Sequence, residues 1–225
     1  MRGYGQYCPI ALAAEVYAER WTPIIIRNLD LGCERYTEIL DGAPGLPRSV
    51  LSQRLRVLER TGVVERERAG RGTFYRLTES GRELARVGDV LGEWGARWRD
   101  VDPAGQDPRL ALWTVARRVG PATLPRPRIV VEFRIGDRRP PDHFWLVLSA
   151  TGNEVLAQPP GFAADGSVTA DVATVVRWHA GQSDLAVAGP SWLGRLVASW
   201  GRLGSYAEPG RTGPAEPRSS TRAKR

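Results

Sequence analysis

Hydrophobic residues recur at helical spacing through the first hundred residues of the chain. Ile10, Ala13, Ala14 and Tyr17 follow the i, i+3, i+4, i+7 pattern of an amphipathic helix, and Pro9 suits its first turn, so we expect a helix from Pro9 to Arg20. The same reasoning predicts more helices and two strands joined by Ala-Gly-Arg-Gly. The predicted helices span residues 22–31, 36–40, 47–61 and 79–98, and the strands span 63–68 and 73–77.

The pattern changes after a polar, proline-containing stretch, which is typical of a linker. Beyond it we predict helices over residues 110–119, 170–179 and 192–203 and strands over 129–135 and 143–149, which together make an α+β domain. The last residues are rich in Pro, Gly, Ser and Arg and cannot form a core. The predicted organisation is a first domain over 1–101, a linker over 102–109, a second domain over 110–207 and a disordered basic tail over 208–225.

Helices followed by a β-hairpin form the plan of a winged helix-turn-helix, and the helix at residues 47–61 has the polarity of a DNA-reading element. Leu51, Leu55 and Leu58 share one face, which must be buried. The other side offers donors and acceptors that suit base edges in the major groove, although a plain solvated face is the alternative for an isolated helix. The residues predicted to contact DNA from this helix are Arg48, Ser49, Ser52, Gln53 and Arg56.

The predicted hairpin carries arginines that could contact the sugar-phosphate backbone. Arg66 and Arg68 lie on its first strand, and Arg71 lies at the tip between Gly70 and Gly72. Glycine allows the backbone to approach closely, while arginine neutralises phosphate or enters the minor groove. The hairpin is therefore predicted to be the wing.

Positive charge is concentrated in two short stretches of the chain. The net charge is +7, and residues 47–76 hold eight arginines against three glutamates, a net +5. Residues 209–225 hold four arginines and one lysine against one glutamate, a net +4, so the rest of the chain sums to −2. Clustered basic charge indicates a polyanionic partner, with an ordinary charged surface as the alternative.

The motifs "CPIALAAEVYAERWTPIIIRNLDLG", "LPRSVLSQRLRVLERTGVVER" and "YRLTESGREL" resemble those of the HxlR family of winged-helix regulators over about residues 7–98. The resemblance implies a homodimer that binds double-stranded DNA at an inverted repeat. By position, the recognition helix would be residues 47–60 and the wing 65–75, with a shorter tip than the family has. Dimers would pair through the terminal helices, residues 9–20 and 79–98.

The run "GSVTADVATVVRWHAGQSDLAVAG" gives residues 128–206 a likeness to sterol-carrier-protein-2-like (SCP2-like) domains, whose closing helical segment is abbreviated here. That likeness implies an apolar tunnel for a hydrophobic small molecule, an effector that could modulate DNA binding. Aromatic side chains suit such a pocket, although aromatic residues at these spacings more often belong to a filled core. The tryptophans in question are Trp145, Trp178, Trp192 and Trp200.

The chain has only two cysteines, and one of them invites a redox hypothesis. Cys8 precedes a predicted helix, where the helix dipole favours a reactive thiolate. Some HxlR-family members sense oxidants or electrophiles at the matching place, which gives an alternative function with a structural second domain. A buried, inert thiol is the competing interpretation, because free cysteine is among the most buried residue types. No feature of the surrounding sequence indicates a reactive thiol at Cys33.

Other classes of protein are disfavoured by the sequence. The only histidines, His143 and His179, belong to no visible nucleophile or metal motif, no glycine-rich phosphate loop is present, and we expect no enzyme activity, metal or cofactor. No run approaches the about 18 apolar residues of a membrane span, and a signal peptide is not evident, so we expect a cytoplasmic protein. A carrier of lipids or other hydrophobic ligands, dimerised through its first domain, is the remaining rival.

Overall fold

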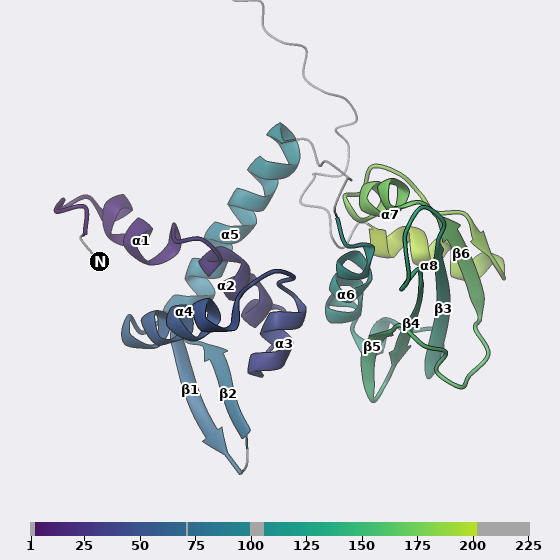
Figure 1. The fold of residues 1–225 in the computed structure, drawn as a ribbon, viewed down its shortest axis with the longest axis horizontal. Coiled ribbons are helices and arrows are strands. Elements are labelled where there is room, and N and C mark those ends of the chain that lie inside the picture. The colour runs from purple at the N-terminus through teal and green to yellow at the C-terminus, as the bar shows by residue number, and fades with distance from the viewer. Residues whose placement is uncertain (1–2, 71, 100–105, 202–225) are drawn as a thin grey trace, which may run out of the picture.

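The computed structural model describes residues 3–70, 72–99 and 106–201, which form two domains (Figure 1). Arg71, half of the predicted linker (102–105), the last residues of the predicted second domain (202–207) and the predicted tail lie outside the described residues. Within the described part, no helix is long and apolar enough to cross a membrane.

The first domain is a group of helices with a two-stranded hairpin that extends away from them (Figure 1). Its core is made by buried apolar side chains, of which Ile25, Ile39, Leu51 and Leu58 are at most 1% exposed. The order of elements confirms the sequence-based plan. The bounds are α1 (Pro9–Tyr17), α2 (Thr22–Asp30), α3 (Tyr36–Asp41), α4 (Arg48–Arg60), β1 (Val64–Ala69), β2 (Gly72–Leu77) and α5 (Glu79–Trp98).

Local chemistry accounts for several of these boundaries. The α1 helix ends at Tyr17, three residues before the predicted end, and a turn leads to Trp21, whose φ of 77° is left-handed. Thr78 begins α5 by accepting a hydrogen bond from the backbone N–H of Gly81 at 3.1 Å. Gly81 must lack a side chain, since a Cβ there would lie 2.2 Å from the carbonyl oxygen of Val63. This close contact fixes α5 against the start of the hairpin.

The second domain is a mixed five-stranded sheet with helices packed on one face. Its strand order is β5-β4-β3-β6-β7, and β3 and β6 form the parallel pair. Alternate β3 residues, among them Val131 and Phe133, pack in one core cluster with residues of α6, α7 and α8. The bounds are α6 (Pro108–Arg118), a 3-10 turn (Pro121–Thr123), β3 (Arg128–Ile135), β4 (His143–Ser149), β5 (Gly152–Leu156), β6 (Gly166–Ala170), α7 (Val172–His179), β7 (Val187–Ala188) and α8 (Ser191–Gly201).

The structure corrects the predicted elements of this half. The α6 helix begins at Pro108, inside the predicted linker, because the side chain of Asp107 accepts a hydrogen bond from the N–H of Arg109 at 3.1 Å. Three strands, β5, β6 and β7, were not predicted. Ala170 ends β6 instead of beginning a helix, and Asp171 caps α7 by accepting a hydrogen bond from the N–H of Thr174 at 2.6 Å.

Candidate nucleic-acid interface

Helix α4 separates its apolar and polar sides as its sequence predicts. Leu51, Leu55 and Leu58 are at most 2% exposed and hold the helix against the rest of the first domain. The polar side faces solvent over more than two turns, where its side chains are free to meet a DNA groove. Its exposed residues are Arg48, Ser49, Gln53 and Arg56, together with Arg60 at the end of the helix.

The N-terminal turn of α4 is attached to α3 by a tyrosine. The hydroxyl of Tyr36 donates to the carbonyl oxygen of Arg48 at 2.6 Å and lies 3.1 Å from the hydroxyl of Ser52. Ser52 is therefore half-buried and has a partner within the protein, unlike the other predicted base-contacting residues. Its role in the structure is to help orient the start of the helix.

A salt bridge that sequence reasoning missed holds the middle of α4. Arg54 lies 2.6 Å from Glu19, in the turn between α1 and α2, and the arginine side chain is only 13% exposed. Because the guanidinium of Arg54 is largely buried, whereas the Glu19 side chain is 36% exposed, removal of Glu19 would leave the positive charge poorly solvated. The pair ties the recognition helix to the end of α1, and a charge pattern alone could not identify it, because 35 residues separate the partners.

The hairpin places its arginines in different situations. Arg68 is exposed, whereas Nε of Arg66 lies 3.3 Å from Glu59 of α4 and is partly neutralised by it. Arg76, on β2, is bound by two carboxylates, Glu34 at 2.7 Å and Glu67. Of the predicted wing arginines in the described residues, Arg68 is thus better placed than Arg66 for a phosphate.

The same network stiffens the base of the hairpin. The backbone N–H of Tyr75 donates to the carbonyl oxygen of Glu34 at 2.8 Å, and Arg35 lies over the ring of Phe74 at 4.9 Å. The hydrogen bond from Arg76 lowers the pKa of the Glu34 carboxyl. The segment before α3 is therefore attached to β2, so the hairpin and the helix-turn-helix form one unit.

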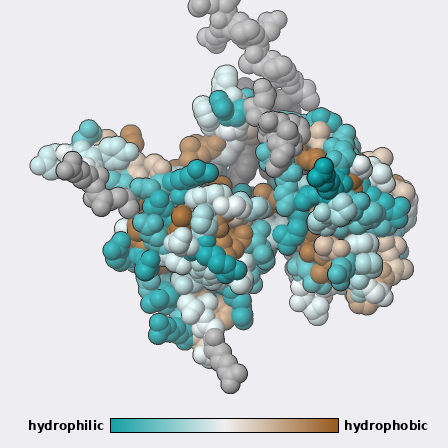
Figure 2. Space-filling view, viewed as in Figure 1, coloured by the Kyte–Doolittle hydropathy of each residue, from teal (hydrophilic) through white to brown (hydrophobic). Residues whose placement is uncertain are grey.

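A stripe of apolar side chains on α5 and α1 is left exposed. Five side chains of α5 follow the spacing of one helix face and are 46–64% exposed, and two further exposed apolar side chains lie on α1. Figure 2 shows hydrophobic areas at the surface of this domain. Exposed apolar side chains along one helix face are typical of an interaction surface. This α1/α5 apolar surface consists of Ile10, Leu12, Val87, Val90, Leu91, Trp94 and Trp98.

The two cysteines have opposite environments. Cys8 is exposed, directly before α1, which contradicts the competing interpretation of a buried thiol. Cys33 is completely buried, and burial raises the pKa of its thiol to about 11. An unpaired thiol reacts as the thiolate, so Cys33 is protected and Cys8 is accessible.

The four tryptophans predicted to line a ligand tunnel do not share a cavity. Trp178 and Trp200 are 0% and 2% exposed within the packed core, where the indole N–H of Trp178 donates to the carbonyl oxygen of Val197 at 3.0 Å. Trp145 alternates with core residues of β4, so it lies on the opposite face of the sheet, beside His143. Trp192 is partly buried below Arg126 at 4.7 Å.

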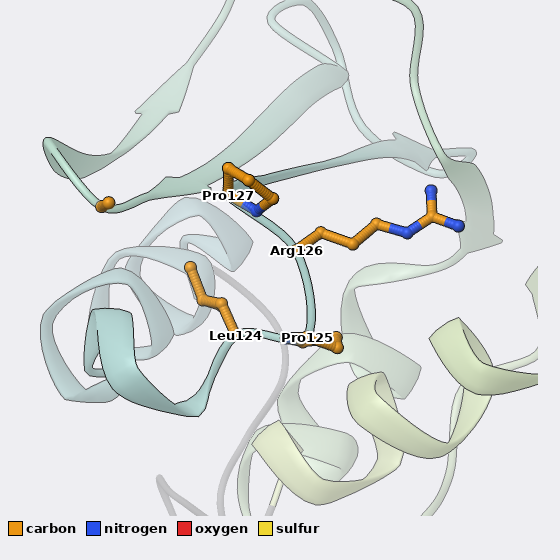
Figure 3. A pocket seen from close by; sticks show the side chains of 5 residues that line it. Leu124, Pro125, Arg126 and Pro127 are labelled. Carbon is orange, nitrogen blue, oxygen red and sulfur yellow. The ribbon is translucent and has the colours of Figure 1, made fainter.

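None of these tryptophans lines either of two depressions on the described surface. One, of about 280 Å³, is open to solvent and lies beside the loop before β3, lined by Leu124, Pro125, Arg126, Pro127 and Ala150 (Figure 3). The other, of about 330 Å³, lies where Leu31 of the first domain meets the end of α6. Trp178 and Trp200 therefore pack as the filled-core alternative describes, and contact of the tryptophans with a ligand stays a prediction.

Comparison with known proteins places the first domain among bacterial regulators. Residues 16–103 match the HxlR-like helix-turn-helix family. The chain is 33% identical over 106 residues to YvaP of Bacillus subtilis, described as an uncharacterized HTH-type transcriptional regulator, and the match covers 45% of this chain and 96% of YvaP. A protein of the same description from Mycobacterium tuberculosis, Rv3095, is 37% identical over 38% of this chain and 56% of its own length. Among solved structures, the reduced form of the transcriptional regulator YodB from B. subtilis is 29% identical, covers 42% of this chain and 97% of its own, and has a TM-score of 0.37.

Proposed function

The chain belongs to the HxlR-like helix-turn-helix family of transcriptional regulators, and we propose that it binds an inverted repeat in double-stranded DNA as a homodimer. The observation that carries this proposal is the exposed polar side of α4, with Arg48, Ser49, Gln53 and Arg56 unburied beside a basic hairpin. In a helix-turn-helix, the first turns of the recognition helix meet base edges in the major groove. Arginine can pair with guanine there and glutamine with adenine.

The α1/α5 apolar surface supports the homodimer. Water contact with Trp94, Trp98 and their neighbours is unfavourable, and a second copy of the same face would remove it. The residue ranges that the family resemblance implies for dimerisation contain this whole surface. Two recognition helices related by a two-fold axis would then meet half-sites about one helical turn, or a multiple of it, apart.

The proposal is tested by duplex selection. The purified protein is incubated with random duplexes, the retained fragments are sequenced, and the affinity for the enriched duplex is measured as salt rises. We expect an inverted repeat and a steep fall in affinity, since each phosphate contact releases counterions. Arg56→Ala should weaken binding, while Arg195→Ala, which removes an exposed arginine from α8, is the matched control. DNA retention that depended neither on the salt concentration nor on Arg56 would count against specific DNA binding and favour the rival function, a carrier of hydrophobic ligands.

Sensing of oxidants or electrophiles through Cys8 is a second candidate function. It is favoured by the exposure of Cys8 at the start of a helix that carries part of the α1/α5 apolar surface. Modification there would place a new group beside that surface and alter the dimer. Comparison of DNA binding before and after treatment with diamide, in the wild type and in Cys8→Ser, tests it, and equal effects on both proteins would refute it.

Modulation by a hydrophobic effector and the SCP2-like identity of the second domain stay predictions. The packing of Trp178 and Trp200 gives the effector little support, since a ligand in the core would have to displace them. Titration of apolar compounds against tryptophan emission, followed by DNA binding with any ligand found, tests this part separately.

A further inference from the structure

Helix α6 has two buried faces that belong to different domains. Leu112 and Val115 are 0% exposed and lie in the core of the second domain. Trp113, between them, is 5% exposed and belongs to the core cluster of the first domain, against which Leu110 also packs. Because one short helix contributes to both cores, the two domains are packed against each other as well as being connected by the linker.

The end of the Trp113 ring is held in a socket that only glycine permits. A Cβ on Gly42 would lie 2.2 Å from Cη2 of Trp113 and 2.6 Å from the side-chain nitrogen of Asn28. Real Cβ atoms do not approach heavy atoms so closely, so any side chain at position 42 would displace the indole or the amide. Arg117 lies over the same ring at 5.6 Å.

Polar groups hold the other walls of this socket in place. Asn28 is fully buried and donates from Nδ2 to the carbonyl oxygen of Ile39 at 2.9 Å, while its Oδ1 accepts from Arg27 at the same distance. Nη2 of Arg27 also donates to the carbonyl oxygen of Gly42 at 2.7 Å. These bonds leave the backbone at Gly42 little freedom, so the position of the socket is well defined.

The socket lies at the turn of the helix-turn-helix. Helix α3 ends at Asp41 and the recognition helix α4 begins at Arg48, so Gly42 is the first residue of the connection between them. A side chain that fills the space beside this turn restricts the angle between α3 and α4. That angle decides how the polar side of α4 meets a DNA groove.

We propose that the second domain supports the turn between α3 and α4 through the contact of Trp113 with Gly42. DNA affinity would then depend on docking of the two domains. The inference rests on the proposed function, since it assigns to the second domain a role in that same DNA site. It also locates the coupling at the turn between α3 and α4, and not along the dimerising helix α5. An open depression beside Leu31 and Arg118 leaves part of the junction between the two domains exposed to solvent.

The experiment combines a double-mutant cycle with DNA binding. Trp113→Ala, Trp113→Phe, Gly42→Ala and the Trp113→Ala/Gly42→Ala double variant are compared with Phe162→Ala, which removes an exposed aromatic ring from the second domain. Urea unfolding is followed by far-UV circular dichroism, and affinity is measured for the duplex enriched by the wild type. All binding is measured where circular dichroism shows each variant folded.

We expect Trp113→Ala to separate one cooperative unfolding transition into two and to weaken DNA binding by about 5- to 150-fold, the usual range of coupling between sites. Trp113→Phe should weaken DNA binding less than Trp113→Ala does, and Phe162→Ala should bind DNA as the wild type does. Gly42→Ala should weaken binding in the wild type and have a smaller effect in the Trp113→Ala background, where the ring it meets is gone.

Wild-type DNA affinity in both Trp113→Ala and Gly42→Ala would overturn the inference, as would an equal effect of Gly42→Ala in both backgrounds. If the wild type retained no duplex, the proposed function would fail instead. The cycle of unfolding free energies would still report whether Trp113 docks the domains.

Discussion

His179 provides a pH-dependent test of the packing of the second domain. It ends α7, and its Nδ1 has no hydrogen-bond partner among the described residues. Burial, aided by the positive charges of Arg118 and Arg27, lowers its pKa to about 4. The imidazole is therefore neutral in the folded protein at pH 7, and the perturbation we choose is His179→Leu, which removes the titrating group and keeps an apolar side chain.

The expected magnitude follows from the two pKa values. An unperturbed histidine titrates near pH 6.5, and the difference of about 2.5 from the folded value corresponds to about 3 kcal/mol. Because the unfolded chain binds a proton at a higher pH than the folded protein, stability is fully present above about pH 6.5. It should fall as the pH is lowered towards about 4. In His179→Leu, the part of the unfolding free energy that changes with pH because of His179 should be missing.

The assay is urea unfolding at intervals between pH 7 and pH 4.5, with the difference in unfolding free energy between variant and wild type plotted against pH. Carboxyl groups that titrate in both proteins cancel in this difference. His143→Leu is the control, because it removes the other histidine from the surface, where its partner is Asp142 at 3.1 Å. Parallel stability curves for His179→Leu and the wild type would refute the burial of a neutral imidazole.

Three further predictions concern the DNA, dimer and thiol surfaces. Gln53→Ala should reduce discrimination among operator variants by about 1–3 kcal/mol. Arg68→Ala should instead weaken binding to all duplexes equally and reduce the salt dependence of the affinity. Competition binding at two salt concentrations would show if these roles are reversed. Trp94→Asp should place a charge on the α1/α5 apolar surface and yield monomers in light scattering; a dimer as stable as the wild type would exclude this surface. A thiol reagent at pH 7.5 should modify Cys8 in the folded protein and reach Cys33 only after denaturation, as peptide mass analysis would report; equal labelling of both would contradict the buried environment of Cys33.

Patterns within short segments of the sequence were sufficient to predict the elements of the first domain. The leucine spacing in α4 predicted which side is buried, because burial repeats with the period of the helix itself. The exposed Arg48, Ser49, Gln53 and Arg56 followed from the same rule. The glycine-rich Ala-Gly-Arg-Gly between two strand-like runs predicted the hairpin.

Periodicity was insufficient where partners are distant in the chain. Ala170 reads as the start of a helix but pairs with Ile135 in the parallel contact of β3 and β6, and that pairing depends on a segment 35 residues away. The role of the tryptophans was left open for a related reason. An indole in the sequence does not reveal whether it fills a core, as Trp178 does, or lies on the outer face of a sheet, as Trp145 does.

The sequence by itself thus determined the winged helix-turn-helix, its polar reading face and its basic charge, because these depend on spacing and residue type within short segments. Only the tertiary structure decided which charges remain available, since Glu59 lies against Arg66 and Glu19 against Arg54 through contacts between separate elements. It alone placed Trp113 in the core of the other domain, beside Gly42. Such a contact depends on the complementary shapes of two surfaces distant in sequence, and shape is a property of the folded chain.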